Sequence, residues 1–266
     1  MFLAPHFMQK TMTLSLITTY QKLCTEFYDL EPHHNHEAAV RFYQTQAIQA
    51  RGPILEPMCG TGRFLLPLLH AGFDAEGFDA SPHMLEALRQ KYAQMSDQPA
   101  PVWQQLIQDF DSKKQYTLIF IPYGSFGLIT NRNDAQQALA ALHRHLAPGG
   151  KMIIEIETTA SVPATLNTWC RGVHTRADGS NIALNTYGSY DEKSQLFSSI
   201  CRYESWVDGV MVATETEDFQ QYLYEFDEFE QLLMATGFKN IQKYSDYAQS
   251  PAKAKPVHTL IYACIG

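Results

Sequence analysis

Short apolar runs alternate with stretches of helical periodicity along the chain up to residue 160. Several of these runs are almost continuously apolar, and strands buried on both faces of a sheet have this texture. Strands that alternate with helices at such spacing are typical of parallel βαβ units. The pattern therefore predicts an α/β fold with a doubly wound, mostly parallel sheet. The expected strands cover residues 54–55, 73–79, 102–107, 116–121 and 152–156.

Helices are predicted where apolar residues recur every three or four positions. In one of them Ala39, Phe42, Tyr43 and Ile48 lie near one face. Ser81, followed by a proline, begins another, because serine caps free backbone amides and proline suits the first helical turn. The expected helices cover residues 12–28, 35–50, 64–69, 134–146 and 227–236, with one more that starts at residue 81.

The texture changes after residue 160, where residues 180–220 lose the helical period and become rich in Thr, Tyr, Ser and Val. Asp208-Gly209 is a favoured two-residue hairpin turn, and it separates two predicted strands at 202–207 and 210–219. We therefore expect an inserted antiparallel β region. Two final strands, 239–247 and 258–265, bring the main sheet to seven strands.

These patterns divide the chain into three parts. Residues 1–50 are an N-terminal helical segment or lid, residues 51–160 and 221–266 form the main α/β domain, and residues 161–220 form the insertion. A chain of 266 residues can bury a sizeable core without disulfides or metals.

Composition and charge exclude several classes of protein. The net charge of −8 disfavours binding to nucleic acid, whose phosphate backbone repels an acidic surface. No apolar run approaches the length that spans a bilayer, and the N-terminus does not resemble a signal peptide. The five cysteines show no CxxC spacing, which favours reduced thiols in a cytoplasmic protein. Neither a membrane nor a nucleic-acid partner is expected.

A glycine-containing loop, residues 56–62 with the sequence Glu-Pro-Met-Cys-Gly-Thr-Gly, follows the first predicted strand. In doubly wound folds the ligand binds beyond the carboxyl ends of the strands, where strand order reverses. Glycines let the backbone approach a ligand closely and adopt unusual dihedral angles. A Gly-x-Gly motif alone does not distinguish such a binding loop from a tight turn that binds no ligand.

Two acidic residues after later strands sharpen the prediction. Asp79 closes the second strand, where a carboxylate can accept hydrogen bonds from both hydroxyls of a ribose. Asp109, after the third strand, could accept a hydrogen bond from an adenine amino group. A dinucleotide fingerprint requires a third glycine where this chain has Leu65, which argues against a nicotinamide-dependent dehydrogenase.

Residues 54–156 resemble the class I S-adenosylmethionine-dependent methyltransferases in the loop at 56–63, the stretch at 77–85 and the Gln-Asp-Phe at 108–110. The resemblance implies a Rossmann-like methyltransferase fold with S-adenosyl-L-methionine as cofactor. The sequence departs from the family's first motif at Met58, where the family usually has glycine. The cofactor-binding residues that the resemblance implies are Glu56, Met58, Gly60, Gly62, Arg63, Asp79, Ala80, Met84, Gln108, Asp109, Phe110 and Ile121.

Tyr28-Asp29, the segment at 123–128 and the β-rich insertion together resemble a narrower group, the bacterial small-molecule methyltransferases that include sugar N,N-dimethyltransferases. This resemblance implies that the insertion covers the substrate and contributes to a homodimer. It also implies that Tyr28 lies near the methionine end of the cofactor, although a core tyrosine on an amphipathic helix fits equally well. The candidates for a catalytic base or an orienting group are Tyr28, Tyr123, His33 and Tyr187.

The predicted function is methyl transfer to a nitrogen or oxygen of a small-molecule acceptor by in-line displacement. Two alternatives stay open: a non-catalytic cofactor-binding or scaffold protein, which Met58 would fit, and a methyltransferase acting on protein or RNA. The net negative charge of the chain argues against RNA as the substrate. The histidines at 33, 34 and 36 are better interpreted as a polar linker or lid than as a metal site, so no metal is expected.

Overall fold

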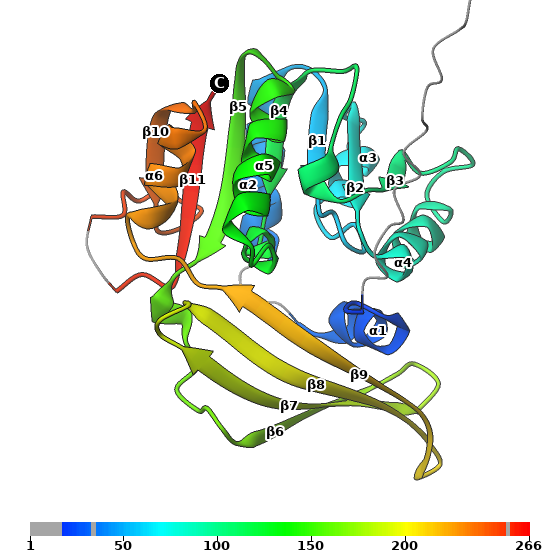
Figure 1. Ribbon diagram of the computed structural model, residues 1–266. Helices are drawn as coiled ribbons and strands as arrows, with labels where there is room; N and C mark the ends of the chain where they lie inside the picture. The colour runs from blue at the N-terminus through cyan, green and yellow to red at the C-terminus, as the bar shows by residue number, and fades with distance from the viewer. Residues whose placement is uncertain (1–17, 33–35, 254–255) are drawn as a thin grey trace, which may run out of the picture.

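The computed structural model describes residues 18–32, 36–253 and 256–266, and it contains two sheets of different kinds (Figure 1). A seven-stranded sheet has the order β10-β11-β5-β4-β1-β2-β3. All of its pairings are parallel except the two that β11 makes with β5 and β10. This arrangement confirms the predicted doubly wound, mostly parallel sheet. Its strands are β1 (Ile54–Pro57), β2 (Ala75–Asp79), β3 (Val102–Gln104), β4 (Tyr116–Ile121), β5 (Leu146–Glu157), β10 (Lys239–Tyr244) and β11 (Thr259–Ile265).

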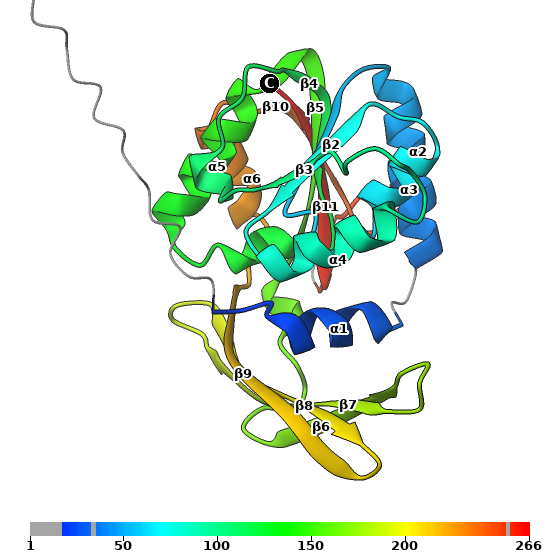
Figure 2. The same cartoon turned by 90° about the vertical axis from the view of Figure 1, so that its right-hand side faces the viewer.

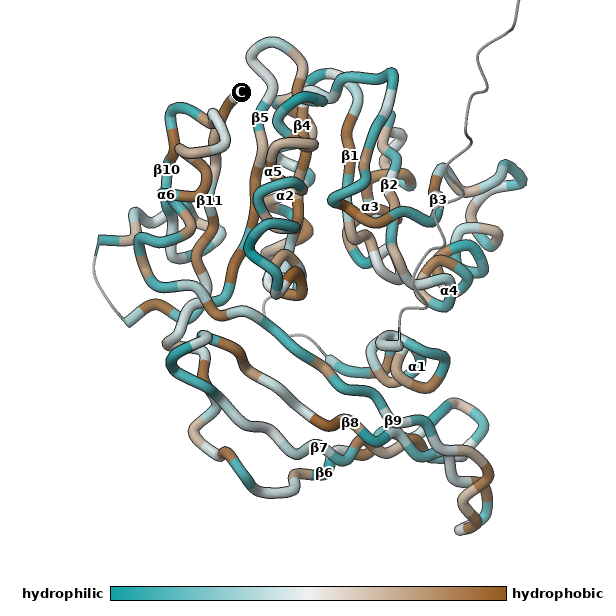
Figure 3. The backbone as a smooth tube through the Cα atoms, in the orientation of Figure 1, coloured by the Kyte–Doolittle hydropathy of each residue, from teal (hydrophilic) through white to brown (hydrophobic). Residues whose placement is uncertain are grey.

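Helices cover both faces of the large sheet, as Figure 2 shows with the sheet seen nearly edge-on. Helices α2 (His36–Ala50), α3 (Leu65–His70) and α4 (Pro82–Tyr92) lie on one side. Helices α5 (Arg132–Arg144) and α6 (Glu228–Ala235) lie on the other. Two hydrophobic clusters result, one on each face. The central strands β1 and β4 are accordingly among the most apolar stretches of the backbone in Figure 3.

The inserted region is a separate four-stranded antiparallel sheet of order β6-β7-β8-β9, below the large sheet in Figure 1. Its turn at Asp208-Gly209 has positive φ at both residues (48° and 76°), which is the hairpin geometry that the sequence predicts. The sheet is larger than expected, because it begins with β6 well before residue 180. Its strands are β6 (Trp169–Thr175), β7 (Asn181–Asp191), β8 (Leu196–Val207) and β9 (Val210–Tyr222).

Helix α1 (Lys22–Leu30) packs against the inner face of this inserted sheet. Its first turn has no side-chain cap from its own N-cap residue. Instead the two carboxylate oxygens of Glu217 on β9 accept the backbone N–H groups of residues 20 and 21, at 3.0 and 2.7 Å. Glu215 accepts the N–H of Leu23 at 2.6 Å. A carboxylate at a helix N-terminus satisfies free amides and complements the helix dipole.

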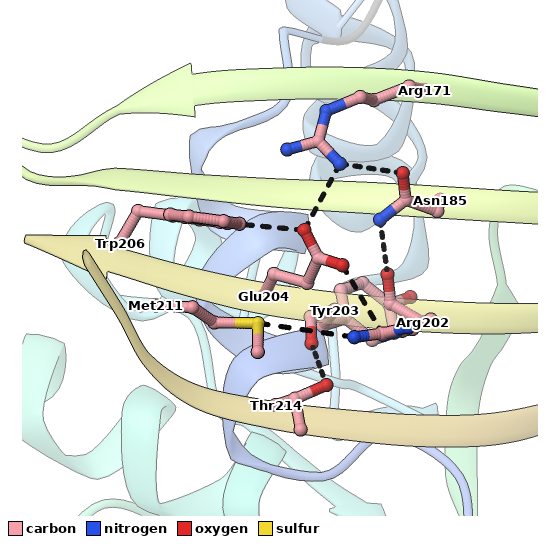
Figure 4. Close-up of polar contacts among 8 residues, drawn as sticks. All are labelled: Arg171, Asn185, Arg202, Tyr203, Glu204, Trp206, Met211 and Thr214. Atoms are coloured by element: carbon pink, nitrogen blue, oxygen red, sulfur yellow. Dashed lines mark hydrogen bonds and ion pairs between the residues drawn. The ribbon is translucent and has the colours of Figure 1, made fainter. Parts of the chain in front are cut away.

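The outer face of the inserted sheet carries a polar network centred on the nearly buried Glu204 (Figure 4). Its carboxylate accepts hydrogen bonds from Arg171 and from the indole N–H of Trp206, both at 3.1 Å. Nε of Arg202 forms an ion pair with the other carboxylate oxygen of Glu204, at 3.3 Å. Around this network lie exposed apolar side chains, among them Trp169 at 57% exposure.

Several local predictions are wrong. Ile48 is 64% exposed, so it lies off the buried face of α2. The third strand ends at Gln104, because the chain then turns into a 3-10 helix, η1 (Ile107–Asp109). The strand expected at 152–156 is longer than predicted, because residues 147–150 also belong to β5. The pairing of β5 with β4 shifts register at this segment. Of the helix expected at 12–28, residues 12–17 lie outside the described residues.

Candidate functional site

A cavity of about 400 Å³ lies at the carboxyl ends of β1 and β2, and we call it the cofactor cavity after the role that the sequence predicts for this edge of the sheet. Parallel strands present these ends at the same edge of the sheet, and β1 pairs with β2 on one side and β4 on the other, so the strand order reverses there. The cofactor cavity is lined by Thr19, Tyr20, Tyr28, Met58, Gly60, Asp79, Ala80, Ser81, Met84, Gln105, Leu106, Ile107, Gln108, Ser125, Leu128, Ile129, Thr130, Asn131, Asp134, Asp218, Phe219 and Gln220.

The glycine loop after β1 is held in a tight conformation by the chain itself. Met58, Gly60 and Gly62 all have positive φ, of 58°, 52° and 84°. A Cβ on Gly62 would come within 2.8 Å of Cγ atoms on Leu66 and Leu88, so this position also has no room for a side chain. The backbone N–H of Cys59 donates to the carbonyl of Phe78 at 3.0 Å, which fixes the loop against β2.

Asp79 connects the loop to the start of α4. Its Oδ2 accepts the N–H of Gly60 at 2.9 Å, and its Oδ1 accepts the N–H of Ser81 at 2.8 Å. Burial raises the pKa of Asp79, and these backbone donors oppose the shift. Each oxygen retains a lone pair, and the side chain lines the cofactor cavity, so Asp79 can also accept hydrogen bonds from two adjacent ligand hydroxyls.

The structure brings six of the predicted cofactor-binding residues together in the lining of this cavity. They are Met58, Gly60, Asp79, Ala80, Met84 and Gln108. Tyr28 lines it as well. The sequence prediction missed the residues that lie opposite them, which come from the segment at 125–134 and from β9. Ser125 and Leu128 belong to the segment at 123–128 on which the narrower resemblance rests. No local motif marks the lining residues at 129–134 or those from β9, because they reach the cavity only through the fold.

The other six lie outside that lining. Asp109 is exposed at the end of η1, because the 3-10 turn directs this residue away from the cavity that Gln108 lines. Phe110 is in the core, where its ring stacks on Phe78 at a centroid distance of 4.9 Å, and Ile121 is also fully buried. The lining contains no contribution from Glu56, Gly62 or Arg63.

Glu56, at the end of β1, is a buried carboxylate of unusual character. It is 2% exposed, and its Oε2 has no hydrogen-bond partner among the described residues. Burial raises the pKa of this carboxyl well above its ordinary value, and the nearby charge of Asp79 raises it further. A buried carboxyl of this kind favours the neutral, protonated form.

Arg63 and Thr61 attach helix α1 to the loop. The guanidinium of Arg63 lies 4.1 Å from the ring centroid of Tyr28 and donates to the Tyr28 carbonyl at 2.8 Å. The hydroxyl of Thr61 donates to Asp29 at 2.6 Å, and Lys91 forms an ion pair with the same carboxylate at 2.8 Å. The Tyr28-Asp29 pair therefore lies directly against the loop, and Tyr28 is held at the edge of the cofactor cavity.

A second cavity of about 890 Å³ adjoins the first, and we call it the acceptor cavity after the role that is proposed for it below. The two share Tyr20, Tyr28, Ser125, Leu128 and Phe219. The remaining lining of the acceptor cavity consists of Tyr123, Gly124, Glu155, Glu157, Gln221, Ser245, Asp246, Tyr247, Pro256, Val257, His258, Thr259 and Ile261.

Glu155 and Glu157, at the end of β5, are the acidic residues of this cavity that the sequence prediction missed. Residues two apart on a strand point to the same face. Two glutamates at alternate positions in the otherwise apolar 152–157 are the signal that could have identified them. Burial raises the pKa of Glu155 to about 7, although Tyr43 and Tyr247 donate hydrogen bonds to it at 2.5 and 3.0 Å.

The other candidates for a base or an orienting group are separated by the fold. Tyr123 lines the acceptor cavity, with its hydroxyl 3.4 Å from Nδ1 of His36. Tyr187 packs against Trp169 in the inserted sheet and lines neither cavity. His33 lies outside the described residues. Within the described ranges no group of three His, Cys, Asp or Glu side chains could hold a metal ion. None of the helices in this part of the chain combines the length and apolar character needed to cross a membrane.

Comparison with known proteins gives a consistent result. Residues 54–150 match the family described as a methyltransferase domain. Over 242 residues the chain is 22% identical to "Putative methyltransferase YqeM" of Bacillus subtilis (strain 168), with 89% of this chain and 93% of that protein covered.

Two solved structures share the fold. The CcbJ methyltransferase from Streptomyces caelestis has a TM-score of 0.75 at 19% identity, covering 93% of this chain and 98% of its own. The sugar N-methyltransferase KedS8 from Streptoalloteichus sp ATCC 53650 has a TM-score of 0.71 at 18% identity, covering 90% and 91%. The matched residues include the glycine loop, Asp79 and the start of β5. Residues 54–150 therefore carry a methyltransferase domain, in a chain whose fold is that of the two solved methyltransferases.

Proposed function

We propose that the chain transfers a methyl group from S-adenosylmethionine, bound in the cofactor cavity, to a small molecule bound in the acceptor cavity. The observation that carries this proposal is the junction between the two cavities, which share five lining residues. A methyl donor in one cavity would face an acceptor in the other across this junction. KedS8, which shares the fold, is named as an enzyme that methylates the nitrogen of a sugar.

The lining of the cofactor cavity fits a ligand of this kind. Asp79 offers two carboxylate oxygens for the two hydroxyls of a ribose. Asp134 and Asp218 also line the cavity, and none of the described lining residues is a lysine or an arginine. A cavity with three carboxylates and no basic side chain favours a positively charged ligand. We assign Met58, Gly60, Ala80, Met84 and Gln108 to the same binding site.

Bound S-adenosylmethionine supplies a methyl group on a positively charged sulfur, which leaves as a neutral thioether. The protein would hold the acceptor in line with that methyl group, and orientation of two reactants can supply on the order of 7–11 kcal/mol of the barrier. Burial raises the pKa of Tyr28 to about 12, and the pKa of Tyr123 is also raised by burial. Both phenols therefore stay protonated near neutral pH, so we assign them to orienting the reactants rather than to accepting a proton.

Each part of the chain has a role in this proposal. The main domain, residues 51–160 and 221–266, binds the cofactor. The N-terminal helical segment and the inserted region at 161–220 cover the substrate, because Tyr20, Tyr28 and Phe219 come from these parts and line both cavities. The homodimer stays a prediction, to be measured by light scattering. The exposed apolar residues on the outer face of the inserted sheet make that face the expected contact.

Calorimetric titration with S-adenosylhomocysteine tests the cofactor site. We expect Asp79→Asn to weaken binding by roughly 100-fold, because the change removes the charge and one acceptor at the ribose position, and hydrogen bonds to charged groups contribute about 1.5–3 kcal/mol each. Asp97→Asn, a matched change on the exposed surface, should bind like wild type. The assignment is wrong if wild type shows no binding at millimolar ligand, or if Asp79→Asn binds as tightly as Asp97→Asn.

A non-catalytic scaffold would bind S-adenosylhomocysteine in the same experiment, so it requires a second measurement. Transfer of a labelled methyl group from S-adenosylmethionine to small molecules distinguishes the enzyme from the scaffold. Transfer to protein or RNA fractions and to no small molecule would favour the other alternative.

A further inference from the structure

Three carboxylates line the acceptor cavity, and they differ in the hydrogen-bond donors that the protein offers them. They belong to Glu155, Glu157 and Asp246. None of the described residues of that lining is a lysine or an arginine, and its titratable residues besides these acids are His258 and four tyrosines. A cavity of this charge repels phosphate and carboxylate groups and attracts a cation.

Two of the three carboxylates are occupied by the protein itself. Glu155 accepts hydrogen bonds from the hydroxyls of Tyr43 and Tyr247, which connects β5 to α2 and to the segment after β10. Asp246 lies at the exposed rim and accepts the backbone N–H of Ser250 at 2.9 Å within its own turn. Both side chains therefore have a structural role.

Glu157 differs from the other two. It is half-buried at the last position of β5, and no described residue donates a hydrogen bond to its carboxylate. Gly124 makes room for this side chain, because a Cβ at that glycine would come within 2.9 Å of Cγ of Glu157. A partly desolvated carboxylate without a donor is unfavourable, and a ligand N–H group in the cavity would satisfy it.

We propose that the acceptor is a small basic amine without phosphate or carboxylate groups, and that Glu157 binds its ammonium group and takes the proton that it must lose. This inference rests on the proposed function. The ammonium N–H donates to the carboxylate, and one proton moves from nitrogen to Glu157. The freed lone pair on nitrogen then forms the N–C bond to the methyl carbon while the C–S bond breaks. Glu157 finally releases the proton to solvent.

The surroundings of Glu157 suit this role. Burial raises the pKa of Glu157 above its ordinary value, and the charge of the nearby His258 opposes that shift. A carboxylate with a raised pKa accepts a proton more readily than an ordinary one. A neutral hydroxyl acceptor would need a stronger base than a carboxylate to lose its proton, which is why the site favours nitrogen over oxygen.

The test uses full-length protein, labelled S-adenosylmethionine and a matched panel. Each small amine, whether aliphatic, cyclic or an amino sugar, is paired with the alcohol of the same skeleton and with an O-phosphorylated derivative. We expect methylation of unphosphorylated amines, and a loss of kcat/KM of roughly 100-fold or more in Glu157→Gln, the range typical for a lost acid–base group. The acidic limb of the pH profile of kcat/KM should disappear in this variant.

Glu157→Asp, which keeps the carboxylate, should retain more activity than Glu157→Gln, and Glu192→Gln on the exposed surface should match wild type. Unchanged S-adenosylhomocysteine affinity in all three variants shows that they are folded and that the cofactor site is intact. The inference is overturned if wild type binds S-adenosylhomocysteine but methylates alcohols, phosphorylated members or no amine. It is also overturned if Glu157→Gln keeps activity within about 3-fold of wild type, equivalent to less than 1 kcal/mol. Absence of S-adenosylhomocysteine binding by wild type would instead reject the proposed function.

Discussion

The two adjoining cavities are assembled from the chain in different ways. One wall of the cofactor cavity comes from a single stretch, 58–108, in which a glycine loop, the end of β2 and the start of α4 follow one another. The acceptor cavity combines α1, the segment at 123–128, the end of β5, β9 and the turns around β11. The cofactor wall can therefore be recognised from local sequence, while the acceptor cavity depends on how distant segments pack.

The two cavities also use their carboxylates differently. Asp79 is fixed by the backbone N–H groups of Gly60 and Ser81, which are 19 and 2 residues away in the chain. Glu155 is fixed by tyrosines from two other elements, at separations of 112 and 92 residues. Substitutions in the first wall should therefore act on local geometry. Substitutions in the acceptor cavity should act on contacts between elements.

The largest effect is expected at the glycine loop. Gly62→Ala should lower the free energy of unfolding by about 4 kcal/mol, because its Cβ would crowd Leu66 and Leu88 and its positive φ disfavours a side chain. Gly72→Ala is the matched control, since Gly72 also has positive φ (81°) but has no atom within 4 Å of an added Cβ. That variant should lose only about 1 kcal/mol. Equal losses in chemical denaturation would show that crowding in the loop is unimportant.

A smaller effect, dependent on pH, is expected in the acceptor cavity. The pKa of Glu155 is raised from 4.5 to about 7 in the folded protein, so the stability that this group contributes is complete below pH 4.5 and is lost as pH rises through 7. Glu155→Gln cannot titrate, so its free energy of unfolding should fall less between these pH values, by about 2–3 kcal/mol. Denaturant titrations across this range measure the slope. Parallel curves for wild type and Glu155→Gln would contradict the prediction, and Glu192→Gln should follow wild type.

The smallest effect is expected at Met58, the residue that departs from the family pattern. Met58 has a φ of 58°, which glycine adopts without strain, but its side chain packs against the main hydrophobic cluster. These contributions oppose each other, so Met58→Gly should change S-adenosylhomocysteine affinity by less than roughly 3-fold, or about 0.7 kcal/mol. Calorimetry measures this. A gain of methyl transfer in the variant over an inactive wild type would instead support the scaffold alternative.

The sequence predicted the large sheet well, because its strands are short apolar runs bounded by clear turn and cap signals. Tyr116–Ile121 has the bounds that periodicity indicated, and Ser81 caps α4 by accepting the N–H of Met84 at 3.2 Å. Errors arose where tertiary context decides local conformation. Residues 147–150 contain proline and two glycines, which favour a turn, yet they form an irregular part of β5 between Leu146 and Lys151, which both pair with β4.

The cofactor cavity was predictable only in part, for a similar reason. Met58, Gly60 and Asp79 carry their own local signals, and the structure places them in its lining. The position of Asp109 after a strand predicts a ligand contact, but a single 3-10 turn decides whether residue 108 or 109 faces the cavity. The role proposed for Glu157 depends on Gly124 and on the sheet register, and neither can be inferred from residues 152–157 alone.

The first turn of α1 takes its hydrogen-bond acceptors from Glu215 and Glu217, about 190 residues later in the chain. The helix start is therefore encoded jointly by two distant segments. In recombination between homologous proteins, α1 and the inserted sheet should be inherited as one block. A chimera that exchanges the inserted sheet while keeping its own first helix would leave the amides of Leu23 and of the two residues before the helix, 20 and 21, without their carboxylates.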